Sequence, residues 1–115
     1  MSLALRVVTF DITEQSQKEE WSHHQDIELP GEILRDTHDK AVVDVALKSF
    51  EFEFVGGEHF IMREYVNLEV SNEGHSSCRV KARARWNTVN PSANSSIKFR
   101  GRIEALVIAD MKPRI

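Results

Sequence analysis

The sequence of 115 residues is long enough for one domain with a core that needs no metal or disulfide. Apolar residues make up 41% and charged residues 29%, which is typical of a soluble globular domain. The net charge of −3 excludes a protein that attracts nucleic acid as a whole, and a single cysteine, Cys78, excludes an internal disulfide. No apolar run could span a bilayer and no signal peptide is recognisable, so we expect a cytoplasmic protein without membrane insertion and leave export by another route open.

Residues 1–40 are predicted to hold one strand and a polar segment. Residues 3–10 are rich in β-branched and apolar side chains, as expected of a strand. Residues 11–25 are polar and lack the apolar stripe of a stable helix, so a short surface helix and a long loop both stay open. Four aliphatic residues around a Pro-Gly turn are expected to dock this segment on the sheet: Ile27, Leu29, Ile33 and Leu34.

Residues 41–110 alternate between apolar and polar side chains in the manner of an antiparallel sandwich. The parity of the apolar residues switches near Lys48, which predicts a β-bulge or a strand whose two ends bury different faces. Three more strands are expected after it, over residues 60–70, 78–86 and 97–109. The last of these ends in "ALVIA", apolar at every position, so both of its faces are expected to be buried there.

The fold predicted from these elements is an all-β antiparallel sandwich of about six strands. Turns of hairpin length separate the strands, and no alternation of strand and helix is visible. One domain over residues 1–115 accounts for the whole chain, with an N-terminal part, 1–40, and a sandwich core, 41–110.

Basic residues alternate along the strand at 78–86, while Cys78 and its small apolar neighbours are expected on the buried side. If the turns form simple hairpins, the last strand lies beside this strand, and Glu51 and Glu69 lie near Arg63 and Arg79. Arg83 would then have no carboxylate neighbour. The cations predicted to share this one face, besides Arg79, are Lys81, Arg83, Arg85, Lys98, Arg100 and Arg102.

Three interpretations of this basic face stay open: a solvated, salt-bridged surface, an interface between copies of the chain, and an anion site. Like charges opposite each other destabilise a sheet, so the acids of the same chain or of a neighbour would be needed to offset them. A nucleic-acid site would need aromatic side chains among the cations, and only Tyr65 lies on that face. Nucleic acid is therefore not an expected partner.

Short motifs in the second part of the chain resemble the H-type lectin family over about residues 41–110. The matching segments, in order, are Val42–Leu47, the turn Val70–Gly74, Trp86–Thr88 and Val107–Ala109. The resemblance implies a six-stranded antiparallel sandwich that assembles as a trimer or hexamer. It also implies binding of a carbohydrate, often N-acetylgalactosamine, near the subunit boundaries, with no metal, cofactor or catalysis.

The same resemblance places the candidate ligand contacts at Arg63, Trp86 and Asn87. Arg63 is the nearest match to the family's arginine, and Trp86 matches its tryptophan. The histidine that follows this tryptophan in the family is Asn87 here, so the sugar specificity does not carry over. From the residues alone, Trp86 fits a packing residue on the apolar face as well as a platform for a sugar ring.

The histidines and acids do not form a recognisable catalytic or metal-binding pattern. His23 and His24 are adjacent, and neighbouring residues of a strand point to opposite faces. His59 follows a Gly-Gly turn and is predicted to stabilise that turn through hydrogen bonds. Glu64 is a carboxylate at a strand position where its neighbours of the same face are apolar. The sequence contains no phosphate-binding loop, no nucleophile elbow and no pair of acids in an apolar setting. We therefore expect no enzyme, no cofactor and no metal.

Two functions stay open. The first is a non-catalytic, oligomeric binding module that takes a carbohydrate. The second is a structural or assembly domain of a larger bacterial or phage-like complex, without a small-molecule ligand.

Overall fold

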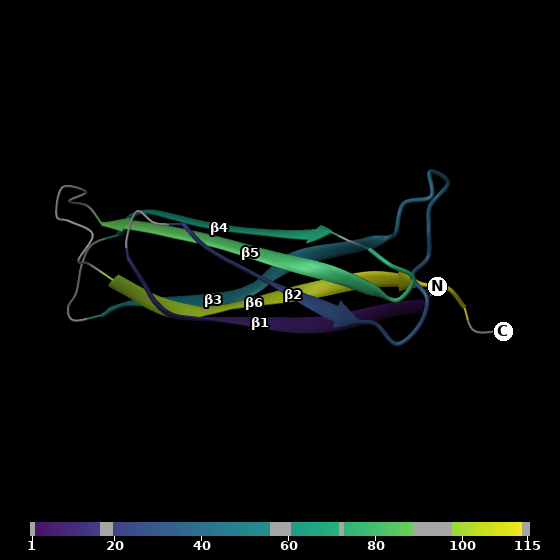
Figure 1. The fold of residues 1–115 in the computed structure, drawn as a ribbon, viewed down its shortest axis with the longest axis horizontal. Coiled ribbons are helices and arrows are strands. Elements are labelled where there is room, and N and C mark those ends of the chain that lie inside the picture. The colour runs from purple at the N-terminus through teal and green to yellow at the C-terminus, as the bar shows by residue number, and fades with distance from the viewer. Residues whose placement is uncertain (1, 17–19, 56–60, 72, 89–97, 114–115) are drawn as a thin grey trace.

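A computed structural model describes residues 2–16, 20–55, 61–71, 73–88 and 98–113, apart from the side chains of 16, 54, 55, 61–64 and 86–88. The six strands are β1 (Ser2–Ser16), β2 (Trp21–Glu28), β3 (Val43–Val55), β4 (Ile61–Ser71), β5 (Ser77–Thr88) and β6 (Lys98–Met111). They form two antiparallel three-stranded sheets, β1-β6-β3 and β2-β5-β4, which face each other in an elongated molecule of 59 × 22 × 18 Å (Figure 1). The prediction of an all-β sandwich of about six strands is confirmed.

The central strands β5 and β6 supply most of the buried core. Every inward side chain of β5 from Cys78 to Ala84 is almost fully shielded from solvent, as is every one of β6 from Ile103 to Ala109. Many of them are alanines, whose small size lets the two sheets approach closely. Phe10 and Phe99 fill the remaining volume.

The bulge expected near Lys48 is present. Leu47 pairs with Ala105 and Ser49 with Glu104, so Lys48 is the extra residue of β3. The bulge restores the inward direction for the phenylalanines that follow, and Phe52 then pairs with Gly101 of β6. The Phe52 ring lies where a side chain at position 101 would be, and it packs edge-on against Phe99 at 5.9 Å.

The helix or loop expected over residues 11–25 is wrong, because β1 continues to Ser16 and β2 begins at Trp21. The inward residues of β2 are a mixture of aromatic, polar and aliphatic side chains: Trp21, His23, Gln25 and Ile27. A strand at the edge of a sheet is only partly covered and tolerates such a mixture. This mixture removed the apolar alternation by which a strand is recognised in a sequence.

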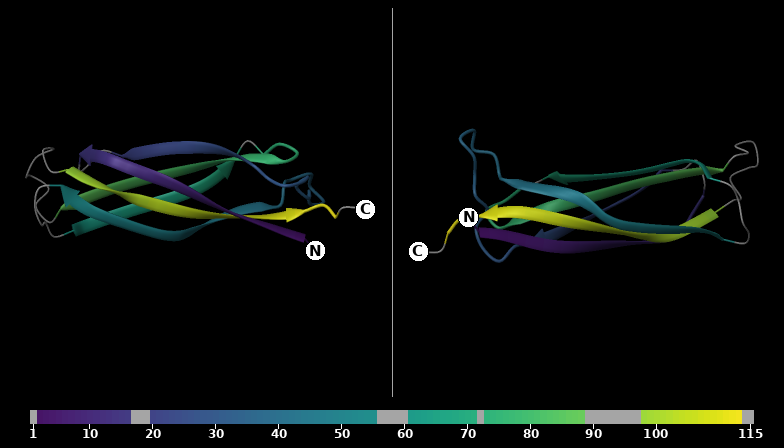
Figure 2. Two further views of the ribbon diagram at one scale, coloured as in Figure 1. Left: turned by 90° about the horizontal axis from the view of Figure 1, so that it is seen from below. Right: turned by 180° about the vertical axis from the view of Figure 1, so that it is seen from behind.

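The partition of strands between the two sheets also differs from the prediction. β3 and β4 lie in opposite sheets, and β6 pairs with β1 and β3 instead of β5 (Figure 2). Glu51 consequently pairs with Arg102, not with Arg63. A turn signal shows that the chain reverses, but it does not show whether the chain returns to the same sheet.

The predicted β4–β5 pairing has the correct parity but a register two residues away from the observed one. Leu68 pairs with Ala82 and Glu69 with Lys81. The pairing with β4 ends at Arg79, whereas Ser77 and Cys78 pair with β2, so the connection between β4 and β5 is longer than predicted.

Residues 29–42 cross from one sheet to the other and close one end of the sandwich. The backbone N–H groups of Leu29 and Ile33 donate to the carbonyls of Ser76 and His75, both at 2.7 Å. Leu34 N–H donates to the Asp110 carbonyl at 2.8 Å in the other sheet. Ile33 is 1% exposed, so the expected docking of this segment is confirmed.

The expectation that both faces of "ALVIA" are buried is only partly correct. The inward residues Ala105, Val107 and Ala109 are buried, whereas Leu106 and Ile108 on the outer face are half-buried. The difference arises because the second sheet covers only the inner face of this central strand.

We predict that Gly101→Ala destabilises the fold by about 3 kcal/mol, because its Cβ would overlap the Glu51 carbonyl oxygen and the Phe52 ring. Gly31→Ala is the matched control: its Cβ would lie 3.6 Å from Met111 Cε, an ordinary contact. For the control we expect the free energy of unfolding to change by less than about 1 kcal/mol. Urea unfolding of both variants measures the difference, and equal losses would contradict the packing of Phe52 over Gly101.

Candidate functional site

The basic residues do not share one face. Lys81, Arg83 and Arg85 lie on the outer face of the β2-β5-β4 sheet, because the inward positions of β5 are its buried alanines. Lys98, Arg100 and Arg102 lie on the outer face of the β1-β6-β3 sheet, on the opposite side of the sandwich. The prediction of a single face with seven cations is therefore wrong, because β5 and β6 belong to different sheets.

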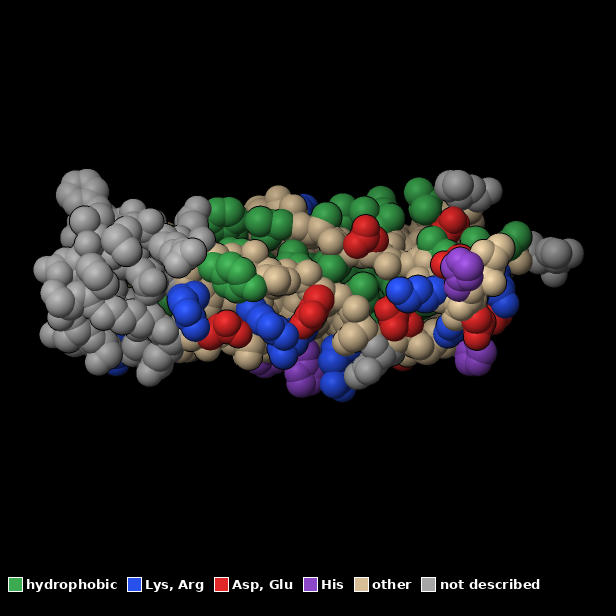
Figure 3. Space-filling view, turned by 90° about the horizontal axis from the view of Figure 1, so that it is seen from above, with side chains coloured by type: hydrophobic (Ala, Val, Ile, Leu, Met, Phe, Trp, Pro, Cys, Tyr) green, Lys and Arg blue, Asp and Glu red, His purple; other side chains and the backbone are tan. Residues whose placement is uncertain are grey.

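Carboxylates of the same chain neutralise most of these cations. Arg83, expected to lack an acidic neighbour, donates to Glu69 at 2.9 Å. Figure 3, which looks onto the β2-β5-β4 sheet, shows blue and red side chains alternating along it. The other pairs that involve basic residues of β5 and β6 are Arg79–Asp26, Lys98–Glu14, Arg100–Glu53 and Arg102–Asp11. Among the described side chains, no ion pair includes Lys81 or Arg85. This arrangement is that of a solvated, salt-bridged surface.

One long edge of the sandwich, between β1 and β2, is closed by side chains. Gln25 Nε2 donates to the Thr9 carbonyl at 2.6 Å, and Arg6 Nη1 donates to the Glu28 carbonyl at 2.8 Å. Trp21 packs edge-on against Phe10 at 6.1 Å, and the His23 ring stacks on Trp21. Polar bridges and rings therefore cover the core along this edge, and His23 has a packing role there.

Along the opposite edge, between β3 and β4, no side-chain hydrogen bond or ion pair joins the two strands among the residues that the structure describes. The described side chains of β3 and β4 that face the other sheet are apolar, yet none of them is fully buried. Leu47 is 44% exposed and Phe50 41%, although both belong to the inward parity of β3. We call this set the β3–β4 seam: Val43, Val45, Leu47, Phe50, Phe52, Val66, Leu68 and Val70. In Figure 3 hydrophobic side chains line the upper margin of the molecule, where β3 and β4 lie.

A second exposed apolar group lies on the outer face of the β1-β6-β3 sheet. Leu3, Leu5 and Val7 are 57%, 63% and 46% exposed, and they stand beside the half-buried Leu106 and Ile108. We call these five residues the β1–β6 patch. It belongs to one sheet, whereas the seam is formed by strands of both sheets.

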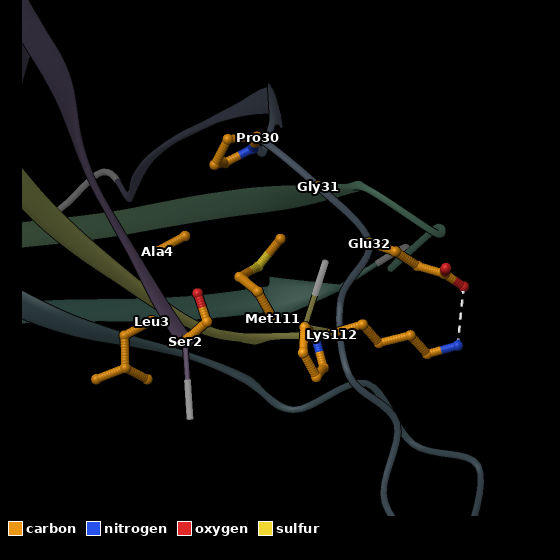
Figure 4. A pocket seen from close by; sticks show the side chains of 9 residues that line it. Ser2, Leu3, Ala4, Pro30, Gly31, Glu32, Met111 and Lys112 are labelled. Carbon is orange, nitrogen blue, oxygen red and sulfur yellow. Dashed lines mark hydrogen bonds and ion pairs between the residues drawn. The ribbon is translucent and has the colours of Figure 1, made fainter. Parts of the chain in front are cut away.

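A hollow of about 710 Å³ lies at the end of the sandwich where β1 begins and β6 ends. Met111 points into it from β6, with Pro30 and Gly31 across from it (Figure 4). Lys112 pairs with Glu32 at 3.0 Å on one side, and this pair lowers the pKa of Glu32. Among the lining residues there is no nucleophile beside a base, so we assign no reaction to this hollow.

The three residues expected to contact a sugar meet at one end of the β4–β5 pair. The backbone of Arg63 pairs with that of Asn87, and Glu64 pairs with Trp86. The side chains of all four lie outside the described part of the structure, and so does His59. The expectation that Arg63, Trp86 and Asn87 contact a sugar therefore stays a prediction, and so does the expected role of His59 in its turn.

Cys78 is buried, as expected, and burial raises the pKa of its thiol. Among the residues that the structure describes, no three His, Cys, Asp or Glu side chains gather in a group that could hold a metal ion. Over the same residues, no helix is long and apolar enough to cross a membrane.

No model of a known protein family, no curated protein and no solved structure matches this chain. The resemblance to H-type lectins therefore remains an expectation from short motifs. The β3–β4 seam was missed at the level of sequence because its residues were assigned to the core. The sequence did contain a sign of it, because β3 and β4 each carry a row of alternating apolar residues.

We predict that the fold loses stability in acid. Arg79 lowers the pKa of Asp26 from its ordinary 3.8, Lys48 lowers that of Glu104 from 4.5, and the backbone N–H groups of Lys40 and His38 lower that of Asp36. A carboxyl with a lower pKa in the folded state stabilises the fold above its unfolded pKa, and this contribution is lost as the pH falls through its folded pKa. The urea midpoint should therefore fall below about pH 4.5, and less steeply in Asp26→Asn. A midpoint that stays constant from pH 7 to pH 3 would contradict these ion pairs.

Proposed function

We propose that the protein is a non-catalytic β-sandwich that binds further copies of itself and serves as an interaction module. The β3–β4 seam carries this proposal. Contiguous apolar side chains exposed at the surface of a soluble protein usually mark a contact with another molecule. The seam also differs from a scattered set of surface residues, because it continues directly into the buried core.

The two edges of the same sandwich support this proposal by their contrast. Where β1 meets β2, the chain provides Arg6, Gln25 and Trp21 to cover the core. Where β3 meets β4, the inward side chains that the structure describes are aliphatic or aromatic and remain partly in water. An edge that leaves apolar surface in water costs about 25 cal/mol for each Å², and association removes that cost.

We predict that the native protein has a mass above 13.2 kDa in light scattering and that Leu47→Lys weakens association at least tenfold. The lysine would place a charge in the seam, where association would have to desolvate it. Val7→Lys is the matched control, because Val7 is 46% exposed and Leu47 44%, but Val7 lies in the β1–β6 patch. Because the contact is apolar, association should persist at high salt. A monomer at every concentration would contradict the proposal.

A second candidate function is carbohydrate binding at the end of the β4–β5 pair. The backbone register supports its arginine–amide part, because Arg63 stands opposite Asn87, whereas Trp86 pairs with Glu64 on the parity of the buried alanines of β5. Arg63 and Asn87 would supply hydrogen bonds to a sugar, and Trp86 would offer its ring only at the end of the strand pair. β4 is also one of the two strands of the seam, so this site would lie near a subunit boundary.

If this second function is correct, an oligomeric sample binds at least one sugar on a glycan array. Trp86→Ala should then reduce that binding about tenfold or more, because the ring would lose its stacking surface. Tyr65→Ala, an exposed aromatic residue elsewhere on β4, is the control and should leave binding unchanged. An oligomeric sample that binds no sugar would remove this function and leave the self-association unaffected.

A further inference from the structure

We infer that the β3–β4 seam is covered by one second copy of the chain, placed by a two-fold axis so that β4 pairs antiparallel with β4 of that copy. The two sandwiches would then share a continuous core. This inference rests on the proposed self-association and adds the partner strand, the register and the symmetry.

β4 is the better of the two edge strands for pairing. Its register against β5 is unbroken from Arg63 to Ser71, and in the described part of the chain β5 is the strand that it pairs with. Its other side therefore presents backbone N–H and C=O groups in a regular row. β3, by contrast, is interrupted by the bulge at Lys48, and both a bulge and a lysine hinder the pairing of an edge strand.

The charges of β4 are compatible with this two-fold pairing. Centred on Asn67, it places Tyr65 opposite Glu69 of the second copy, and Val66 opposite its Leu68. No like charges then face each other over residues 65–69, and Glu69 is already compensated by Arg83 at 2.9 Å. The Tyr65 hydroxyl accepts a hydrogen bond from Asn67 Nδ2 at 2.9 Å, so its own hydrogen is available to a carboxylate across the interface.

A second copy accounts for the whole seam, whereas a single added strand accounts for half of it. A peptide strand paired with β4 would cover Val66, Leu68 and Val70 and leave Leu47 and Phe50 of β3 exposed. A second copy brings its own β3 along with its β4, so both layers of the sandwich meet their counterparts in one contact. The same surface then serves both partners, as two-fold symmetry requires.

Two-fold symmetry also limits the size of the assembly. A contact that uses the same surface on both subunits closes with two copies, unless another surface takes part. The expected mass is therefore twice the chain mass of 13.2 kDa, which differs from the trimer or hexamer that the lectin resemblance implies.

Cysteine cross-linking tests this register directly. In a Cys78→Ala background, Asn67→Cys should form an intermolecular disulfide under mild oxidation, because residues opposite each other on antiparallel strands lie within the Cα distance of a disulfide. Thr9→Cys, an exposed position on the outer face of β1, is the control and should remain unlinked.

A cross-linked dimer for Asn67→Cys, with none for Thr9→Cys and with its yield reduced by Leu47→Lys, would support the inference. If the native protein associates and is sensitive to Leu47→Lys, but Asn67→Cys does not cross-link, the β4 pairing is overturned and the proposed function stands. A preferential link at Thr9 would show that the copies meet across the outer face of the β1-β6-β3 sheet, against the inference. A strictly monomeric native protein would overturn both.

Discussion

In the part of the chain that the structure describes, each sheet of this sandwich has three strands, so one strand in each is flanked on both sides. This constraint decides which inward side chains can be fully shielded from water. The fully buried side chains come largely from the central strands β5 and β6, and the edge strands can bury their inward residues only if something covers the edge. The two long edges of the sandwich differ in what covers them.

The β1–β2 edge is covered by groups that the chain itself provides. Arg6 and Gln25 reach backbone carbonyls of the opposite sheet, and Trp21 shields Phe10. These groups satisfy polar atoms and exclude water at the same time. The β3–β4 edge has no comparable bridge among the described residues, and its apolar side chains remain partly exposed. A second copy of the chain would provide the missing cover.

The sequence predicted much of the strand architecture because alternation depends on local burial. The bulge near Lys48 followed from the change of parity between Leu47 and Phe50, and the structure confirms it. β2 escaped detection because its inward residues include His23 and Gln25, which edge positions tolerate.

The assignment of strands to sheets could not be predicted in the same way. The Gly-Gly pair at residues 56–57 indicates a reversal, but β3 and β4 lie in opposite sheets on either side of it. That single difference moved β6 away from β5 and divided the basic residues between two faces. It also placed the apolar rows of β3 and β4 at one shared edge, which no local pattern reveals. The register of β4 against β5, two residues from the predicted one, gave Arg83 a partner in Glu69.

Amide hydrogen exchange, measured strand by strand at high and at low protein concentration, tests the central claim most directly. If two copies meet through β4, amides of residues 65–71 exchange more slowly in the concentrated sample, while the outer edge of β1 is unchanged. Equal exchange of β4 at both concentrations, in a sample shown to associate, would contradict this account of the β3–β4 seam.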